Sequence, residues 1–418
     1  MSDELTHACI IPLIGGMVLG VSQAVGGPPD FLASYSDFRK NDAHAQKHYD
    51  DVPFYMLDIP YWKKVAAKQR PDIVTTVCPC AGLSITSASS RNHGAKSTHN
   101  RWMYETADFV LENMRPAVMF GENAPGLFGQ KGRPVANKLH SIAKKHGYSF
   151  SMVYTDTRLH GLPQRRPRTF YFLWRAPRAP KFQKIERPEV TVTDFVRGVE
   201  MGRMPYERIE YCRFPLETDI YYLYAQHRWG QAWRSECENR TVLEQLKREG
   251  KQELMDLFAW VKNNHPEHEQ TGEILRHKNL IESNRGLWDE SPKVVSTYTP
   301  AVMFKNVKRI VHPLEDRFLN VRELMALMGF PKDFHLDLGE DEAQYEKNLD
   351  VGMHHISQNV PVSTAHDMAD YAINVLDRKV QLSDTDFYMF DNTKGLRVIA
   401  SKQNLEAFDK EVEDDDSD

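Results

Sequence analysis

The chain of 418 residues contains little cysteine and no long apolar run, and both absences narrow its class. No apolar stretch approaches the roughly 18 residues needed to cross a membrane, so we expect no membrane span. The five cysteines form an odd and sparse set, which indicates a reducing compartment rather than a disulfide framework. The first residues lack a basic segment followed by an apolar one, so we do not expect secretion.

Metal-ligand spacing and net positive charge are missing too. Cys78 and Cys80 are one residue apart, and no second cysteine or histidine pair with metal spacing stands near them, so we expect no metal site. The net charge is −5, but the last eight residues hold six acids, and the chain without them carries about +1. We therefore expect residues 406–418 to form a disordered acidic tail, while a local basic face can still bind nucleic acid.

Strand-like and helix-like runs alternate through the first part of the chain, which predicts an α/β fold with a parallel sheet. From Ala176 onward prolines interrupt this alternation, and it returns only near the end. We therefore predict one α/β domain formed by residues 1–178 and 286–405. A smaller domain, residues 179–285, is inserted late in the chain, and we expect a helix in it over residues 244–263.

The most informative stretch is a strand-like run, Ile73–Val77, that leads directly into Cys78, Pro79 and Cys80. Proline removes a backbone donor and ends the strand, so Cys80 lies just beyond its carboxyl end. Open α/β sheets place their chemistry at that edge, which makes Cys80 a candidate nucleophile. The alternative is a small buried cysteine, which is the commoner role for an isolated one.

Other polar residues follow predicted strands at the same edge. Glu122 and Asn123 end an apolar run, and a carboxyl group beside a thiol can serve as acid or base. A basic turn, Arg165–Arg168, precedes an apolar strand and suits an anion or a carbonyl oxygen, with a plain surface turn as the alternative. Asp58 ends a third run, either as a ligand contact or as a turn residue that caps a helix.

Two loops complete the pattern. Gly15 and Gly16 lie between a strand-like run and a helix, where backbone N–H groups can approach a ligand or the turn can simply pack helix on strand. Residues 84–101 are small, polar and basic, and they directly follow the candidate nucleophile. We expect a lid there rather than an ordinary surface loop.

In their order, these stretches resemble the cytosine-C5 DNA methyltransferase family over residues 1–175 and 286–376. The matching motifs are Pro79-Cys80 with Ser84, Glu122-Asn123-Ala124, Gly161-Leu-Pro-Gln164 through Arg168, Arg322-Glu323 through Gly329-Phe330-Pro331, and Asn359-Val-Pro-Val362. Each motif is weak alone, but together in the family order they are specific. The resemblance implies a Rossmann-like, S-adenosylmethionine-dependent methyltransferase sheet with a smaller target-recognition domain.

Several positions depart from the family pattern, mostly around the cofactor pocket. Ala81 replaces the glutamine after the nucleophile, Leu13 stands in place of the first glycine and Ile11 in place of the phenylalanine of the first motif, and Gln358 replaces a glycine. By spacing, Lys40 stands where the family has the acid that holds the cofactor ribose, with Asp37 and Asp42 as neighbours. These changes leave open whether the cofactor is S-adenosyl-L-methionine or a modified analogue.

The resemblance implies three groups of site residues. The catalytic group is Cys80 as nucleophile, Glu122 as proton donor to the ring, and Arg168 as a support for the ring oxygen, with Arg166 beside it. The cofactor-binding group is Ile14, Gly15, Gly16, Asp58, Ile59, Pro79, Asn359 and Val360. The nucleic-acid-binding group is Ser84, Arg91, Lys96 and Gln164. We expect the basic turn to lower the pKa of the Cys80 thiol and burial to raise that of Glu122.

The implied reaction is transfer of a methyl group from S-adenosyl-L-methionine to C5 of a cytosine in double-stranded DNA. The base would be flipped into the pocket, and Cys80 would bond transiently to its C6 atom. Residues 179–285 would read the target sequence. We expect a monomer beside a cognate restriction system, in the cytoplasm of a bacterium or phage-infected cell or wherever the DNA is.

Three other interpretations stay open. The first keeps the chemistry and takes tRNA as the substrate. The second is a DNA-binding relative without catalysis, suggested by the changes around the cofactor pocket but opposed by the joint presence of the cysteine, glutamate and arginine. The third, a nicotinamide-dependent oxidoreductase, could use the glycine turn but leaves those three residues unexplained.

Overall fold

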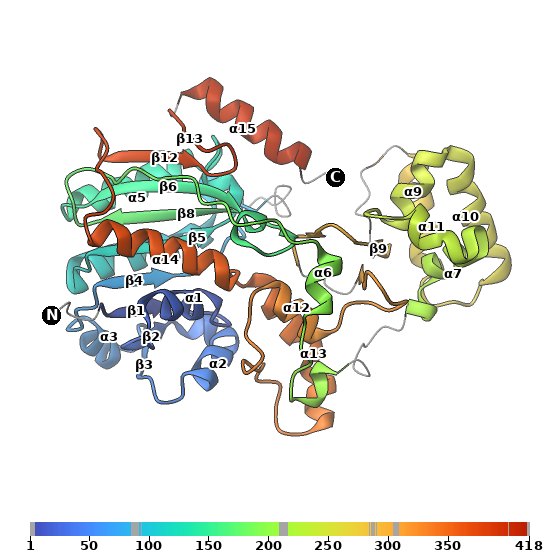
Figure 1. Ribbon diagram of the computed structural model, residues 1–418, viewed down its shortest axis with the longest axis horizontal. Helices are drawn as coiled ribbons and strands as arrows, with labels where there is room; N and C mark the ends of the chain where they lie inside the picture. Colours follow the sequence, from blue (N-terminus) through green and yellow to red (C-terminus); the bar gives the residue numbers. More distant parts are fainter. Residues whose placement is uncertain are drawn as a thin grey trace.

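The computed structural model describes residues 5–84, 92, 94–208, 216–283, 285, 289, 291–303, 309–399 and 401–415. A large body is built around a nine-stranded sheet, and a cluster of helices lies apart from it (Figure 1). Two short strands, β9 (Lys293–Val294) and β11 (Ile310–Val311), pair with each other in the segment that joins the two parts.

The central sheet has the strand order β13-β12-β6-β8-β5-β4-β1-β2-β3. Its strands are β1 (His7–Ile10), β2 (Phe31–Ser34), β3 (Phe54–Met56), β4 (Ile73–Thr76), β5 (Val118–Asn123), β6 (Ser149–Asp156), β8 (Pro167–Trp174), β12 (Phe387–Asp391) and β13 (Leu396–Arg397). β1 to β5 pair in parallel, whereas β8 is antiparallel to both β5 and β6. The predicted Rossmann-like sheet is confirmed, and its strand order reverses beside β1, where such sheets bind ligands.

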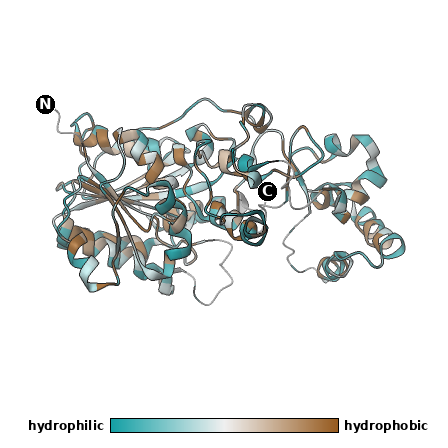
Figure 2. Ribbon diagram, turned by 90° about the horizontal axis from the view of Figure 1, so that it is seen from below, coloured by the Kyte–Doolittle hydropathy of each residue, from teal (hydrophilic) through white to brown (hydrophobic). Residues whose placement is uncertain are grey.

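Helices cover both faces of this sheet (Figure 1, Figure 2). α1 (Gly16–Val25) packs along α14 (Val362–Leu376) on one face, and α4 (Arg101–Phe109) packs with α5 (Arg133–Lys145) on the other. The body also contains α2 (Arg39–His48), α3 (Pro60–Ala66), α6 (Val192–Arg197), α12 (Val321–Leu327), α13 (Glu342–Gln358) and α15 (Lys402–Asp415). Among the described residues, no helix has both the length and the apolar character that a membrane crossing requires.

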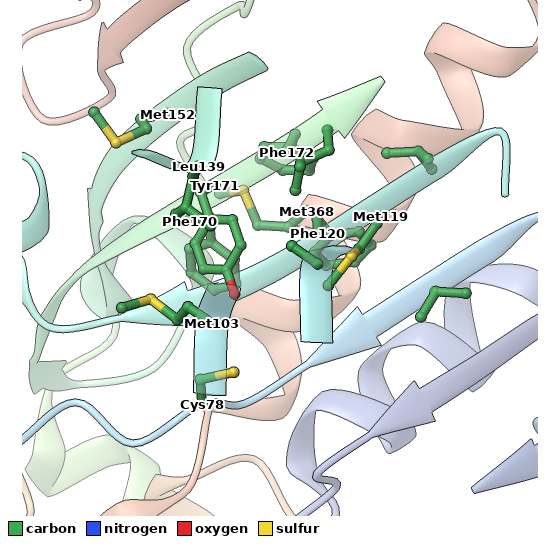
Figure 3. Packing of buried hydrophobic residues seen from close by; sticks show 14 of the residues in the cluster. Cys78, Met103, Met119, Phe120, Leu139, Met152, Phe170, Tyr171, Phe172 and Met368 are labelled. Atoms are coloured by element: carbon green, nitrogen blue, oxygen red, sulfur yellow. The ribbon is translucent and has the colours of Figure 1, made fainter. Parts of the chain in front are cut away.

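Large aromatic side chains fix the centre of the sheet. The rings of Phe120 and Phe172 lie 5.1 Å apart on neighbouring strands, and Trp174 stacks on Phe172 at the same distance. Figure 3 shows Phe120 and Phe172 within the core and places the hydroxyl group of Tyr171 above Cys78. Because burying each such side chain contributes roughly 1.5–3 kcal/mol, the strand ends that carry the polar residues rest on a rigid support.

The separate cluster of helices comprises α7 (Ile220–Trp229), α8 (Trp233–Glu236), α9 (Val242–Glu249), α10 (Lys251–Asn264) and α11 (Thr271–Glu282), and we call residues 216–283 the helical domain. It has its own apolar core, to which Val294, Val311 and Phe318 of the connecting segment also contribute. The single helix expected over residues 244–263 is two helices, because Gly250 has a φ of 138° between α9 and α10.

The boundary predicted at residue 179 is wrong. Ala179 and Phe182 belong to the core of the sheet, while Val192, Val196 and Tyr206 pack in the second core cluster with residues of α12 and α13. The prolines after Ala176 interrupt the alternation of strands and helices without detaching the chain from the body. The small domain therefore begins near residue 216.

The acidic tail is also more ordered than predicted. α15 extends to Asp415, and its Leu405 and Phe408 are buried. The ring of Phe408 lies 4.9 Å from that of Phe128, and both oxygens of the Asp409 carboxylate accept from the backbone N–H of Gln130 at 3.2 Å. The expected disorder from residue 406 is wrong as far as Asp415, because Leu405, just before the tail, and Phe408, within it, anchor the helix.

Candidate active site

The ends of β4 and β5 and the start of β8 bring the predicted catalytic residues together. Cys80 follows β4, and Glu122 lies at the carboxyl end of β5. β8 runs antiparallel beside β5, with Thr169 opposite Asn123, so Arg168 enters the sheet where β5 ends. The Nε atom of Arg168 lies 2.7 Å from Oε1 of Glu122, which makes a close ion pair at this edge.

The Cys80 thiol is half-buried and senses the same charges. Burial raises its pKa, and the carboxylate of Glu122 raises it further, whereas Arg168 and Arg166 act to lower it. The predicted lowering of this pKa is wrong for the protein alone, because burial outweighs the field of the two guanidinium groups. The thiol therefore stays protonated as long as the carboxyl group of Glu122 is negatively charged.

Glu122 is 4% exposed, and burial raises the pKa of its carboxyl group against the opposing effects of Arg168 and Arg166. This direction confirms the prediction. Among the described residues, Oε1 has no hydrogen bond of good geometry, although Arg168 is close. A carboxyl group in this state can hold a proton and donate it to a ligand.

Arg166 supports the site by hydrogen bonds to three backbone carbonyl groups. Its Nη1 donates to the carbonyl oxygen of Val302 at 2.7 Å, and its Nη2 donates to the carbonyl oxygens of Ser357 and Asn359 at 2.8 and 2.9 Å. Burial lowers its pKa to about 9, and the neighbouring Arg168 lowers it too. The side chain is 2% exposed and acts on Cys80 through its charge.

Gln164 is a second brace, and the prediction that it binds nucleic acid is wrong. It is fully buried on β7 (Gln164–Arg165), which pairs with β10 (Thr299–Pro300). Its amide nitrogen donates to the carbonyl oxygen of Leu327 at 2.9 Å, and its amide oxygen accepts from the N–H of Val302 at 3.0 Å. Both ends of the side chain are thus satisfied inside the protein.

The glycine turn and the last motif meet, although 343 residues separate them. Oδ1 of Asn359 accepts from the N–H of Gly16 at 2.9 Å. A Cβ atom at Gly16 would lie 2.2 Å from the carbonyl oxygen of Val360, so only glycine fits there. The side chain of Ile14 is fully buried in the second core cluster, which leaves its backbone to face a ligand.

The backbone of this turn is strained. Ile11 has a φ of 58° and Leu13 a φ of 51°, in the left-handed region that glycine favours. Each non-glycine residue in that region costs roughly 1–2 kcal/mol, and a β-branched one such as Ile11 is a genuine outlier. The buried carboxyl group of Asp42 accepts from the N–H of Leu13 at 3.0 Å. The sequence showed Asp42 only as a neighbour of the ribose position.

Asp58 and Ile59 are exposed and lie just after β3. The carboxylate of Asp58 accepts from the N–H of Ser36 at 3.1 Å, which joins the ends of β3 and β2. A cavity of about 760 Å³ opens beside Asp58, lined also by Tyr35 and Leu57. Its volume lies within the roughly 300–1,000 Å³ typical of ligand pockets.

The spacing that placed Lys40 at the ribose position is wrong. β2 ends at Ser34 and α2 begins at Arg39, so Lys40 lies exposed in the first turn of the helix. Tyr35 directly follows the strand instead, and its ring packs 4.6 Å from that of Trp102. No sequence signal singled out this pair, because each is an ordinary apolar position in its own run.

Hydrogen bonds through Gly94 link the two ends of the segment predicted to be a lid. The N–H of Gly94 donates to the carbonyl oxygen of Gly82 at 2.6 Å, and Asn100 donates to that of Gly94 at 2.9 Å. Ser84 is partly exposed and Lys96 exposed, while Arg91 lies outside the described residues. In the part of the chain that the structure describes, no group of three or more His, Cys, Asp or Glu side chains could hold a metal ion.

Comparisons with solved structures support the fold. A prophage-encoded protein of E. coli, described as a candidate DNA modification methyltransferase, matches with a TM-score of 0.54 and 15% identity over 89% of this chain and 99% of that one. The Entamoeba histolytica methyltransferase EhMeth matches with a TM-score of 0.55 and 12% identity over 90% of this chain and 99% of that one. No curated protein matches the chain.

The family is identified by sequence as well. The model of the C-5 cytosine-specific DNA methylase family matches residues 13–370, which include the glycine turn, Cys80, Glu122, Arg168 and Asn359. The chain therefore belongs to the C-5 cytosine-specific DNA methylase family, whose methyl donor is S-adenosyl-L-methionine.

Proposed function

We propose that this protein is a DNA (cytosine-5-)-methyltransferase that acts on a cytosine flipped out of double-stranded DNA. The observation that carries this proposal is the meeting of Cys80, Glu122 and Arg168 at one partly buried edge of the sheet, with the ion pair of the last two at 2.7 Å. A base inside a duplex cannot reach such a site, so it must leave the stack.

The proposed chemistry begins at Cys80. C5 of cytosine is a poor nucleophile until the Cys80 sulfur adds to C6, and this addition places negative charge on the ring. Glu122 gives its proton to N3 as that charge develops, and Arg168 supports the ring oxygen and orients the carboxylate. S-adenosyl-L-methionine supplies the methyl group for C5. Water then takes the C5 proton, the bond between sulfur and C6 breaks, and N3 returns its proton.

The raised pKa values of Cys80 and Glu122 fit this sequence when they are treated as a pair. A negative Glu122 raises the pKa of the thiol, so the two groups oppose each other's ionisation. Once the carboxyl group is protonated, this opposition ends, and Arg166 and Arg168 favour the thiolate. The reactive form of the pair is therefore a thiolate beside a neutral carboxyl group.

Residues of the predicted cofactor group follow β1, β3 and β4 or lie just after α13. Ile14, Gly15 and Gly16 with Asn359 and Val360 would hold the amino-acid end of S-adenosyl-L-methionine. Asp58 and Ile59 would contact the adenine, and Pro79 would contact the cofactor next to Cys80. The cavity beside Asp58 supports the placement of the adenine, and the hydrogen bond from Gly16 to Asn359 joins the two segments proposed for the amino-acid end.

The DNA would lie between the body and the helical domain. Ser84, Lys96 and Arg91 of the lid would contact the phosphates, and the helical domain would read the target sequence. We also propose that the protein acts as a monomer beside a cognate restriction system, in the cytoplasm of a bacterium or an infected cell.

Mass spectrometry of nucleosides tests the proposal. Duplex DNA and tRNA are incubated separately with the protein and S-adenosyl-L-methionine, with Cys80→Ser protein as the control. We expect 5-methylcytosine in the DNA alone, and none with the variant. Methylation of tRNA instead would keep the chemistry and overturn the substrate, and a modified group of another mass would overturn the plain cofactor.

A further inference from the structure

We propose that Asp42 is a positioning residue for the cofactor turn, residues 11–16. It holds the backbone of the turn in a left-handed conformation that is unfavourable for the non-glycine residues Ile11 and Leu13. The inference rests on the proposed function, because it takes this turn as the place where S-adenosyl-L-methionine binds. Leu13 stands where the family pattern has a glycine, and the hydrogen bond from the buried carboxyl group of Asp42 stabilises the conformation that a glycine would adopt without strain.

The turn is fixed at both ends by side-chain oxygens from distant elements. Oδ1 of Asp42, on α2, accepts from the N–H of Leu13 at 3.0 Å. Oδ1 of Asn359, at the end of α13, accepts from the N–H of Gly16 at 2.9 Å. Both oxygens come from residues that are at most 2% exposed, so water does not compete for the two N–H groups.

α2 makes a second contact with the turn. The position that a Cβ atom would occupy at Gly15 lies 3.4 Å from Cβ of Ala45, one helical turn after Asp42. The helix therefore both bonds the strained residue and packs against the glycine beyond it. A shift of α2 would release Leu13 and Gly15 together.

Asp42 itself is in an unfavourable state that packing alone does not explain. Its Oδ2 is buried and makes no hydrogen bond of good geometry among the described residues, although the hydroxyl group of Ser34 interacts with the carboxyl group. Burial raises the pKa of the carboxyl group to about 7, against the opposing effects of Ser34 and the N–H of Leu13. A buried carboxyl group whose hydrogen bonds are incomplete destabilises the fold. Such a residue is expected where its position serves the site rather than the core.

A double-mutant design separates positioning from general stability. Asp42→Ala removes the acceptor, and because Leu13 and Ile11 then leave the left-handed region, we expect the affinity for S-adenosyl-L-methionine to fall about tenfold. Glycine adopts that region freely. On a Leu13→Gly background, the same Asp42→Ala change should therefore lower the affinity less than about threefold.

Arg378→Gly is the matched control. Arg378 is another non-glycine residue in the left-handed region, with a φ of 60°, and it is exposed just after α14. The change relieves backbone strain at a distance from the turn. It should leave the tenfold loss caused by Asp42→Ala unchanged.

Isothermal titration calorimetry of each full-length variant with S-adenosyl-L-methionine gives the dissociation constants, and thermal unfolding shows which variants fold. Rescue by Leu13→Gly but not by Arg378→Gly supports the inference. An equal loss in all three backgrounds, or no loss with Asp42→Ala, overturns it.

A second variant covers the case in which Asp42→Ala does not fold. Asp42→Asn keeps the acceptor and should bind within threefold of wild type, and a tenfold loss there would contradict the inference. A wild-type protein that binds no cofactor would overturn the proposed function itself.

Discussion

At the scale of single residues, the site depends on how Cys80 and Glu122 share protons. Burial raises the pKa of both groups, and the negative carboxylate raises that of the thiol further. Arg166 and Arg168 act in the opposite direction on both. The active form needs Cys80 without its proton and Glu122 with one, so activity should depend on pH as a property of the pair.

Glu122→Gln tests this dependence. The side chain keeps its shape but cannot donate a proton to the ring, and the loss should resemble the roughly 3–4 kcal/mol that follows removal of one oxyanion donor, or about a hundredfold or more in rate. In the wild type the rate should fall at high pH, because Glu122 ionises as the pH passes its raised pKa. The variant should lack this fall, and its residual rate should rise with pH as the thiol ionises. Single-turnover rates measured against pH on duplex DNA show both effects.

Arg133→Lys serves as the control for that measurement, since Arg133 lies on α5 with its guanidinium group over the ring of Phe387, away from the site. Its pH profile should match that of the wild type. A Glu122→Gln rate within threefold of wild type would remove Glu122 from the mechanism.

The residues of the site were predicted with uneven success, and the reason is physical. A strand that ends in a thiol or a carboxyl group marks the edge of the sheet in the sequence, which is why Cys80 and Glu122 could be found. Gln164 could not be distinguished from a DNA contact, because its partners, the backbone groups of Leu327 and Val302, lie far along the chain. The role of Asp42 could not be predicted, because it depends on the left-handed backbone conformation of Leu13, and a leucine in the sequence gives no sign of that conformation.

At the scale of elements, α1 packs along α14, and this contact joins the cofactor turn to the last motif. A Cβ atom at Gly20 would lie 2.4 Å from the carbonyl oxygen of Val362 and 2.6 Å from the backbone nitrogen of His366. Both are backbone atoms of α14, so the helices would have to move apart.

Gly20→Ala should therefore destabilise the protein by roughly 1–3 kcal/mol, as overpacking of a buried contact does. It should also weaken cofactor binding, because α14 begins three residues after Asn359. Thermal unfolding and calorimetry with S-adenosyl-L-methionine measure the two effects. Gly27→Ala is the matched control: nothing lies within 4 Å of a Cβ atom there, so the melting temperature should stay the same. A stable Gly20→Ala protein would show that the two helices adjust freely.

Elements with strong local patterns were predicted well, and those defined by single residues were not. The apolar runs of β4 and β5 match their predicted places. The break at Gly250 and the anchoring of α15 by Leu405 and Phe408 depend on a single torsion angle and on two side chains. Periodicity and composition average over such details.

At the scale of the whole molecule, the body and the helical domain lie apart (Figure 1), and each has its own apolar core. This separation leads us to expect that chemistry and sequence selection are separable as well. Replacement of residues 216–283 by a short flexible linker should leave methylation of cytosine in duplex DNA but abolish the preference for one sequence. Sequencing of methylated positions in a random DNA library measures the preference.

A larger deletion provides the comparison. Removing residues 179–283 also removes Phe182, Val192 and Tyr206, which are buried in the two cores of the body, so this protein should not fold. Unchanged site choice after the smaller replacement would place recognition on the body instead.

The central claim is that the sulfur of Cys80 bonds to the pyrimidine ring, and covalent trapping tests it most directly. Duplex DNA that contains 5-fluorocytosine is incubated with the protein and S-adenosyl-L-methionine, because fluorine at C5 blocks the loss of the proton that releases the enzyme. Denaturing electrophoresis followed by mass spectrometry of peptides should show one protein–DNA adduct, located at Cys80 and missing from Cys80→Ser. An adduct at another residue, or methylated DNA without any adduct, would contradict the account.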